Sequence, residues 1–140
     1  RHNALFAGLQ LKPGSRAVTT DTCVPISRLA ECVVETAQEA DASGLPYMVV
    51  GHVGDGNFHM LYLTDPAIPA ERELAESLNR RQALRAIRAG GTCTGEHGVG
   101  LHKMELLQEE AGDAAIDLMR TLKQALDPRN ILNPGKIFTL

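Results

Sequence analysis

The strongest fold signal in the chain is Gly51-His52-Val53-Gly54-Asp55-Gly56-Asn57-Phe58-His59, which joins two apolar runs that extend from Tyr47 to Leu63. Asp-Gly between alternating apolar residues is a strong hairpin signal, because a type I′ turn needs positive φ at both central residues. We therefore predict two antiparallel strands joined at Asp55 and Gly56. Apolar residues occupy both faces of this hairpin, so we expect it to be buried on both sides.

The predicted turn determines which side chains share a face. With Asp55 and Gly56 at its centre, His52 lies directly opposite His59. Directly opposed residues point to the same face, with Cβ atoms ~4.5–5.5 Å apart. Two imidazoles at that separation can share one metal ion, since Zn–N bonds are ~2.0–2.1 Å long. The alternative is that both histidines cap the rim of the sheet and bond to the backbone.

Helices dominate the chain outside the hairpin. We predict a strand over residues 17–24, which are rich in Thr and Val, and a helix over residues 25–43. A second helix spans residues 70–89, with acidic residues early and basic residues late. Residues 101–126 form one or two helices, broken near Gly112. This order indicates an α+β fold, in which helices cover an antiparallel sheet.

Length and composition are those of an ordinary globular domain. The 140 residues suit one domain, residues 1–140, since domains cluster around ~100–150 residues. No apolar run approaches the ~20 residues that a transmembrane segment needs. A net charge of −3 and an aromatic share of 4% argue against a nucleic-acid partner. Three widely spaced cysteines are typical of reduced thiols and, with no visible signal peptide, predict a cytoplasmic location.

A second segment that could carry chemistry is Gly95-Glu96-His97-Gly98-Val99-Gly100, which is too rich in glycine for a helix interior or a stable strand. Glu96 and His97 are adjacent, so their side chains diverge in an extended stretch. Glu96 can join His52 and His59 in a set of two histidines and one carboxylate. His97 then remains a free imidazole, suited to general-base work. The alternative is a glycine-rich connector with a solvated Glu-His pair.

Four motifs in chain order resemble the C-terminal domain of FAD-linked oxidases of the vanillyl-alcohol oxidase superfamily, in the branch with D-lactate dehydrogenase, glycolate oxidase and D-2-hydroxyglutarate dehydrogenase. They are residues 21–27, 51–59, 94–100 and the closing Asp127-Pro128-Arg129-Asn130-Ile131-Leu132-Asn133-Pro134-Gly135-Lys136-Ile137-Phe138. The resemblance implies a ferredoxin-like cap domain on the substrate side. It also implies FAD, bound mainly by an N-terminal domain absent from this chain, so we expect the chain alone to be inactive.

The resemblance further implies roles for individual residues. The residues that match the family's ligands for a divalent metal, zinc or manganese, are His52, His59 and Glu96. His97 matches the base that takes the proton of the 2-hydroxyl. Arg1 matches the residue that binds the substrate carboxylate, for which the guanidinium fork is well suited. The closing stretch returns towards the flavin domain, so Asn133 and Lys136 are cofactor-side candidates.

The reaction that the resemblance implies is oxidation of a D-2-hydroxy acid to the 2-oxo acid, with hydride going to flavin and with metal assistance. In the hydroxyglutarate branch, an Asn occupies the position of Leu61. That branch also has a Lys shortly before the residue that matches Asp21, at the position where this chain has Thr19. Both departures favour a small substrate such as lactate or glycolate over a dicarboxylate. The expected partners are this substrate, the FAD domain, an unidentified electron acceptor and, in a homodimer, a second copy. Peripheral contact of the full-length protein with a membrane is also considered.

Two other function classes stay open. A non-haem Fe(II) oxygenase uses the same ligand set, but it normally needs a jelly roll of many short strands. A non-catalytic metal- or ligand-binding module would bind its metal tightly without a partner domain.

Overall fold

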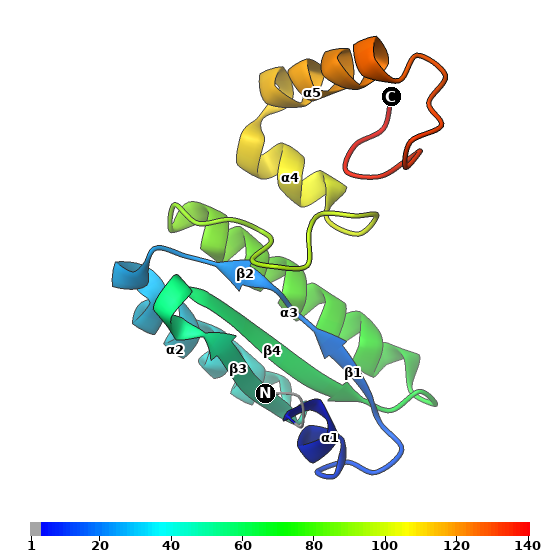
Figure 1. The fold of residues 1–140 in the computed structure, drawn as a ribbon. Helices are drawn as coiled ribbons and strands as arrows, with labels where there is room; N and C mark the ends of the chain where they lie inside the picture. Colours follow the sequence, from blue (N-terminus) through cyan, green and yellow to red (C-terminus); the bar gives the residue numbers. More distant parts are fainter. Residues whose placement is uncertain (1–3) are drawn as a thin grey trace. The chain divides into compact units, whose positions relative to one another are not determined.

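An antiparallel sheet around β4 (Asn57–Thr64) forms the core of the computed structural model, which describes residues 4–140 (Figure 1). β3 (Tyr47–His52) pairs with one edge of β4, while β1 (Arg16–Thr19) and β2 (Thr22–Cys23) share the other edge. Every residue of β4 is buried, whereas β3 is partly exposed. Burial on both faces is therefore confirmed for β4 and wrong for β3, because β3 is an edge strand.

The predicted strand over residues 17–24 is present but interrupted at Thr20 and Asp21. Its two parts keep the same offset relative to β4, so Asp21 comes opposite His59. At the interruption the Met60 N–H donates to the hydroxyl of Thr20 at 2.8 Å instead of to a backbone carbonyl. The Thr20 carbonyl is thereby free to accept a hydrogen bond from a side chain.

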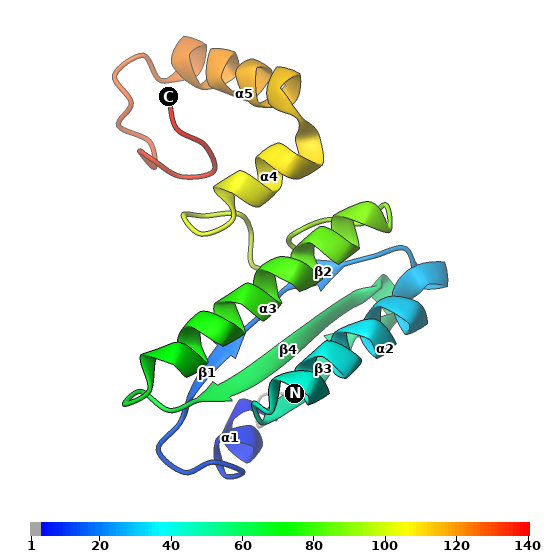
Figure 2. The same cartoon turned by 180° about the vertical axis from the view of Figure 1, so that it is seen from behind.

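Two helices, α2 (Ile26–Ser43) and α3 (Pro69–Arg88), cover one face of the sheet, as Figure 2 shows from behind. α2 ends at Gly44, whose φ of 73° is the left-handed conformation that glycine adopts without strain. The core between helices and sheet holds these buried residues: Ala40, Leu45, Met60, Tyr62, Ala75 and Leu78. The α+β prediction is confirmed, and the order strand–helix–strand–strand–helix follows the ferredoxin-like pattern.

The opposite face of the sheet carries a short helix and a polar cluster. We use the term polar cluster for His52, His59 and Glu96. α1 (Ala4–Leu9) lies close to β3 at one end, where a Cβ on Gly8 would stand 2.3 Å from the Met48 methyl carbon. Because side chains alternate along a strand, Met48, His52 and His59 all belong to this face. The two histidines lie at the other end of the sheet, away from Met48 in the strand register.

The hairpin turn differs from the predicted one. Its loop contains a 3-10 helix, η1 (Val53–Asp55), followed by Gly56, so His52 pairs with Asn57 and not with His59. The reason is tertiary: the Val24 N–H donates to the Gly56 carbonyl at 3.0 Å, and a Cβ on Gly56 would lie 1.9 Å from the Val24 oxygen. The register moves by two residues, which preserves the face of every side chain.

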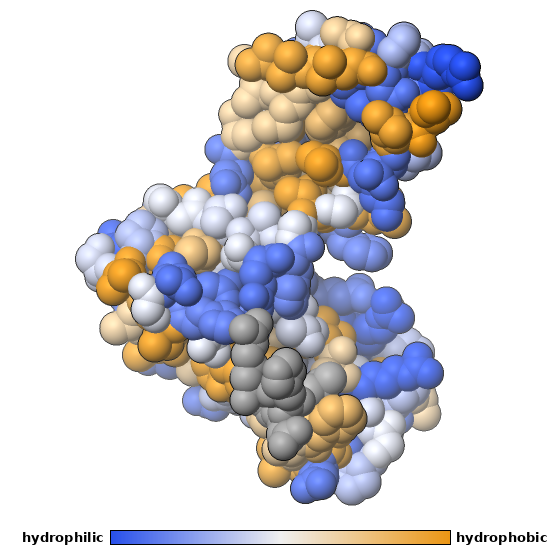
Figure 3. Space-filling view, in the orientation of Figure 1, coloured by the Kyte–Doolittle hydropathy of each residue, from blue (hydrophilic) through white to orange (hydrophobic). Residues whose placement is uncertain are grey.

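The chain divides into two compact units, the first ending at Glu96 and the second running from His97 to Leu140. The second unit holds α4 (Met104–Ala111) and α5 (Asp113–Leu126), separated at Gly112 as predicted. Figure 3 shows apolar side chains gathered over α5, and the exposed leucines there are Leu118, Leu122 and Leu126. Within residues 4–140, none of the helices combines the length and the apolar character that crossing a membrane requires.

Candidate metal centre

His59 is the most buried member of the polar cluster, with 5% of its surface exposed. Its Nδ1 lies 2.9 Å from the carbonyl oxygen of Thr20, the carbonyl that the strand interruption leaves available. A carbonyl only accepts, so we assign the proton to Nδ1 and the lone pair to Nε2. A histidine whose Nδ1–H is held by a backbone carbonyl presents Nε2 as an oriented metal-ligating nitrogen.

His52 approaches from the neighbouring strand at the end of β3. Its ring centroid lies 6.4 Å from that of His59, and the two ring planes are nearly perpendicular, at 86°. The predicted sharing of one face is confirmed, although the two residues are diagonal neighbours and not directly opposed. Diagonal partners in a sheet are still within reach of side chains as long as histidine.

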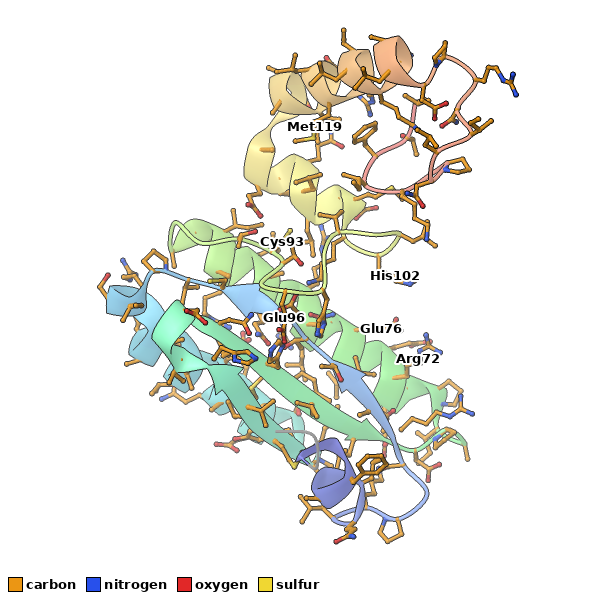
Figure 4. The ribbon with its side chains drawn as sticks, viewed as in Figure 1. Arg72, Glu76, Cys93, Glu96, His102 and Met119 are labelled. Carbon is orange, nitrogen blue, oxygen red and sulfur yellow. The ribbon has the colours of Figure 1, made fainter. Side chains whose placement is uncertain are left out.

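Glu96 completes the cluster from the glycine-rich loop, and Figure 4 shows it extending towards the sheet. Its Oε1 lies 3.2 Å from Nε2 of His59 and 3.7 Å from Nε2 of His52. Together the three residues offer two imidazole nitrogens and one carboxylate oxygen within 4.8 Å of one another. The structure thus brings together the three residues that were predicted as metal ligands.

The donor set and its spacing fit a divalent cation. Ligands of a tetrahedral zinc ion with bonds of ~2.0–2.1 Å lie about 3.3 Å apart, close to the separations of Glu96 Oε1 from the two histidines. Imidazole and carboxylate ligands suit zinc, manganese and ferrous iron alike. Three protein ligands leave further coordination positions for water or a substrate, the arrangement typical of catalytic metal sites.

Sequence reasoning gave no role to Asp21, which the structure places directly beside the cluster. The Asp21 carboxylate is 1% exposed and accepts hydrogen bonds from the Thr94 hydroxyl at 3.0 Å, the Gly95 N–H at 2.9 Å and the Glu96 N–H at 3.2 Å. Asn57 Nδ2 donates to it at 3.0 Å, from the end of β4. The available signal was that the motif of residues 21–27 begins at this aspartate.

The loop approaches the sheet so closely that only glycine fits at position 95. A Cβ on Gly95 would lie 1.7 Å from Asn57 Nδ2 and 2.7 Å from Asp21 Oδ1. The Oδ1 of Asn57 is buried and has no hydrogen-bond partner among the described residues. Gly95 therefore lets the loop backbone lie directly against the side chains of Asn57 and Asp21, as expected of a glycine-rich loop that packs on a site.

The two positions that were predicted to decide substrate size lie side by side. Thr19 and Leu61 are cross-strand partners in the β1–β4 ladder. Leu61 follows His59 by two residues, so it belongs to the same face as the metal ligands, and it is 4% exposed. Thr19 is exposed at the edge of the sheet.

Four other residues were predicted for the site. Arg1 is outside the described residues. His97 is exposed and is the first residue of the second unit. Asn133 and Lys136 are exposed in the C-terminal segment, where the Lys136 N–H donates to the Asn133 carbonyl in the predicted turn. His102, also exposed, belongs to the loop before α4 (Figure 4).

Comparison with known proteins identifies the family. The sequence profile of "FAD linked oxidases, C-terminal domain" matches residues 1–137. A zebrafish (Danio rerio) protein named probable D-lactate dehydrogenase, mitochondrial, is 49% identical over 140 residues, which are 100% of this chain and 28% of that protein. Glycolate oxidase subunit GlcD of Bacillus subtilis is 41% identical over 138 residues, which are 99% of this chain and 29% of that protein.

More distant similarity agrees with this result. D-2-hydroxyglutarate dehydrogenase of Pseudomonas putida is 39% identical over 119 residues, covering 85% of this chain and 12% of that protein. A solved structure, 4-ethylphenol oxidase from Gulosibacter chungangensis in complex with isoeugenol, shares the fold with a TM-score of 0.63 at 22% identity, over 94% of this chain and 26% of that one. The chain spans about a quarter of the length of the first relatives. It belongs to the family of FAD linked oxidases, C-terminal domain.

Proposed function

We propose that this chain is the substrate-side domain of a flavin-dependent enzyme that oxidises a small D-2-hydroxy acid, lactate- or glycolate-like, to its 2-oxo acid. The family supports FAD as the cofactor, and the names of the relatives support a hydroxy-acid substrate. The observation that carries the proposal is the convergence of His52, His59 and Glu96 from two strands and one loop.

In this proposal, His52, His59 and Glu96 hold a divalent cation, zinc or manganese. When bound, the cation supplies Lewis-acid polarisation of the 2-hydroxyl and the carboxylate, and the flavin supplies the oxidising equivalent. His59 keeps its proton on Nδ1 through the Thr20 carbonyl, so Nε2 is the nitrogen that would bind the cation. The chain's contribution is thus a rigid set of oxygen and nitrogen donors on one face of a sheet.

The remaining roles fall to residues that carry the proton and the carboxylate of the substrate. His97, the neighbour of Glu96 in the chain, is proposed to take the hydroxyl proton as a general base, since a neutral imidazole nitrogen can accept a proton. Arg1 is proposed to bind the carboxylate through its two-pronged guanidinium. Asn133 and Lys136 are proposed to contribute on the cofactor side.

The pair of Thr19 and Leu61 supports a small substrate. Leu61 gives the site face an apolar side chain close to the proposed metal ligands, and Thr19 opposite it carries no charge. A second carboxylate on the substrate would find neither a cation nor an amide at these positions, and a charge left without a partner is costly to desolvate. Lactate and glycolate avoid this cost.

The proposed partners are an N-terminal FAD domain and an electron acceptor. The leucines exposed on α5, Leu118, Leu122 and Leu126, support contact with further protein, because large apolar patches mark interaction sites. Several relatives are named as mitochondrial, so a cytoplasmic location for this chain stays a prediction. The jelly roll that a non-haem oxygenase needs does not agree with a sheet covered by α2 and α3.

The test is an assay of the full-length protein with a dye as electron acceptor. The substrates would be D-lactate, glycolate, L-lactate and D-2-hydroxyglutarate, and the flavin absorption spectrum would be recorded in parallel. We expect a flavin spectrum and oxidation of D-lactate or glycolate with a kcat/KM above that for D-2-hydroxyglutarate. A protein that holds flavin and oxidises none of the D-2-hydroxy acids would overturn the proposal.

A further inference from the structure

Asp21 has a buried carboxylate that accepts hydrogen bonds from the segment carrying Glu96. Of the three candidate metal ligands, Glu96 is the one that lies outside the helices and strands. His52 and His59 are fixed by their strands, whereas Glu96 lies within the irregular, glycine-rich segment between α3 and α4. The Asp21 carboxylate accepts hydrogen bonds from three consecutive residues of that segment, Thr94, Gly95 and Glu96. Its position therefore determines where the Glu96 backbone lies.

The carboxylate is suited to this task because it sits in the sheet itself. Asp21 occupies the interruption between β1 and β2, opposite His59, and its Oδ1 lies 3.6 Å from His59 Nδ1. That nitrogen is the one held by the Thr20 carbonyl, on the side of the ring away from Nε2. Asp21 thus contacts the Glu96 backbone and Nδ1 of His59, whereas the Glu96 carboxylate faces Nε2 of His59.

The loop lies too close to the sheet for any side chain at position 95. The space between Gly95 and the sheet is filled by Asp21 and Asn57, and Asn57 Nδ2 donates to both the Asp21 carboxylate and the Thr22 carbonyl, each at 3.0 Å. A buried carboxylate needs donors on its oxygens, and backbone N–H groups from consecutive residues provide them in a fixed geometry. The same bonds that satisfy Asp21 hold the loop against the sheet.

We propose that Asp21 is a positioning residue that fixes Glu96, so that the affinity of the centre for a divalent cation depends on a carboxylate that does not bind the cation. This inference rests on the proposed metal centre. It extends to this aspartate the general rule that residues which orient metal ligands control metal affinity about 10- to 100-fold.

The decisive experiment is a double-mutant cycle on the full-length protein, with the dissociation constant of Zn²⁺ measured by competition with a chelator. We expect Asp21→Asn to weaken Zn²⁺ binding about 10- to 100-fold, because an amide in place of the carboxylate directs N–H groups at the donors of Gly95 and Glu96. In a Glu96→Gln background, we expect Asp21→Asn to change the affinity less than about twofold, because the ligand that it positions is already lost. Equal losses in both backgrounds, or no loss in either, would overturn the proposal.

Two further sets of variants keep the outcome interpretable. If Asp21→Asn does not fold, Thr94→Val removes one donor to Asp21 without burying a new charge, and Thr94→Ser keeps that hydroxyl. We expect weaker Zn²⁺ binding for Thr94→Val than for Thr94→Ser, and equal affinities would contradict the proposal. Asp41→Asn removes a carboxylate from the exposed end of α2, where it accepts from Tyr47, and should leave the affinity unchanged.

His59→Ala separates this inference from the proposed function. If His59→Ala binds Zn²⁺ as the wild type does, the metal centre itself is wrong. If His59→Ala abolishes binding while Asp21→Asn does not weaken it, the metal centre stands and the role of Asp21 is wrong.

Discussion

At the scale of single residues, the candidate centre depends on small departures from regular strand geometry. The Thr20 hydroxyl replaces a backbone carbonyl in the ladder, and the carbonyl that is released orients His59. One residue further on, Asp21 turns its carboxylate to the loop that carries Glu96. These departures lie beside the candidate metal centre, and strand irregularities in proteins are common next to active sites.

Gly95→Ala should destabilise the protein by about 1–3 kcal/mol, the usual cost of inserting a methyl group into a packed region. The added Cβ would overlap Asn57 Nδ2 at 1.7 Å. Gly54→Ala is the matched control, since a Cβ there meets nothing within 4 Å and its φ is not positive. Urea unfolding of the two variants checks this, and equal stabilities would show that the loop does not pack as described.

Thr19→Lys should shift substrate preference towards a dicarboxylate. The lysine would stand beside Leu61 on the site face, and its ammonium could pair with a second carboxylate. We expect the ratio of kcat/KM for D-2-hydroxyglutarate to that for D-lactate to rise about fivefold, equivalent to an ion pair of about 1 kcal/mol. Gln38→Lys adds the same charge on α2 and should leave the ratio unchanged; a rise in both variants would point to a general charge effect.

At the scale of elements, the end of α2 and the break between α4 and α5 follow from local chemistry, and the hairpin turn does not. α2 ends at Gly44, and α4 and α5 meet at Gly112, as their glycines predict. The turn between β3 and β4 is shaped instead by the segment after β2, since the Cys23 thiol donates to the Asp55 carbonyl and Val24 bonds to Gly56. A local turn rule cannot include partners about 30 residues away in the sequence.

The end of α5 carries a pH dependence that can be tested. Lys123 and the N–H groups of Leu132 and Ile131 lower the pKa of Asp127 to about 2. Since this folded-state pKa lies below the ~3.9 of an unfolded aspartate, the carboxylate stabilises the fold above about pH 4, and this contribution is lost as the pH falls towards 2.

Asp127→Asn should therefore lower the unfolding temperature at pH 6 and flatten its decline between pH 4 and pH 2. Thermal unfolding followed by circular dichroism across this range is the measurement. Asp117→Asn is the control, because Asp117 is exposed on the same helix and accepts from Arg120. A wild-type curve parallel to that of Asp127→Asn from pH 6 to pH 2 would contradict the assigned role.

At the scale of the whole molecule, the chain spans about a quarter of the length of its relatives. Within that length it places the candidate metal ligands on one face of a sheet. The proposed reaction also needs a flavin, which the family name implies. Cofactors of this kind carry the redox chemistry, and the protein positions them.

The 140-residue chain alone should not oxidise D-lactate with a dye as acceptor, whereas the full-length protein should. The physical reason is that the hydride acceptor is bound mainly by a domain outside this chain in the proposed enzyme. Both proteins would be assayed at equal concentration, with and without added FAD. Turnover by the 140-residue chain without added FAD would contradict the division of labour between domains.

The sequence by itself determined the helices, the α+β class, the family motifs and the shared face of His52 and His59. These features depend on local propensity and on the alternation of side chains, which a two-residue change of register leaves intact. Only the tertiary structure decided the turn, the interruption at Thr20 and Asp21, and the hydrogen bonds that join Asp21 to the Glu96 backbone. Those depend on hydrogen bonds between segments up to 75 positions apart, which no local pattern encodes.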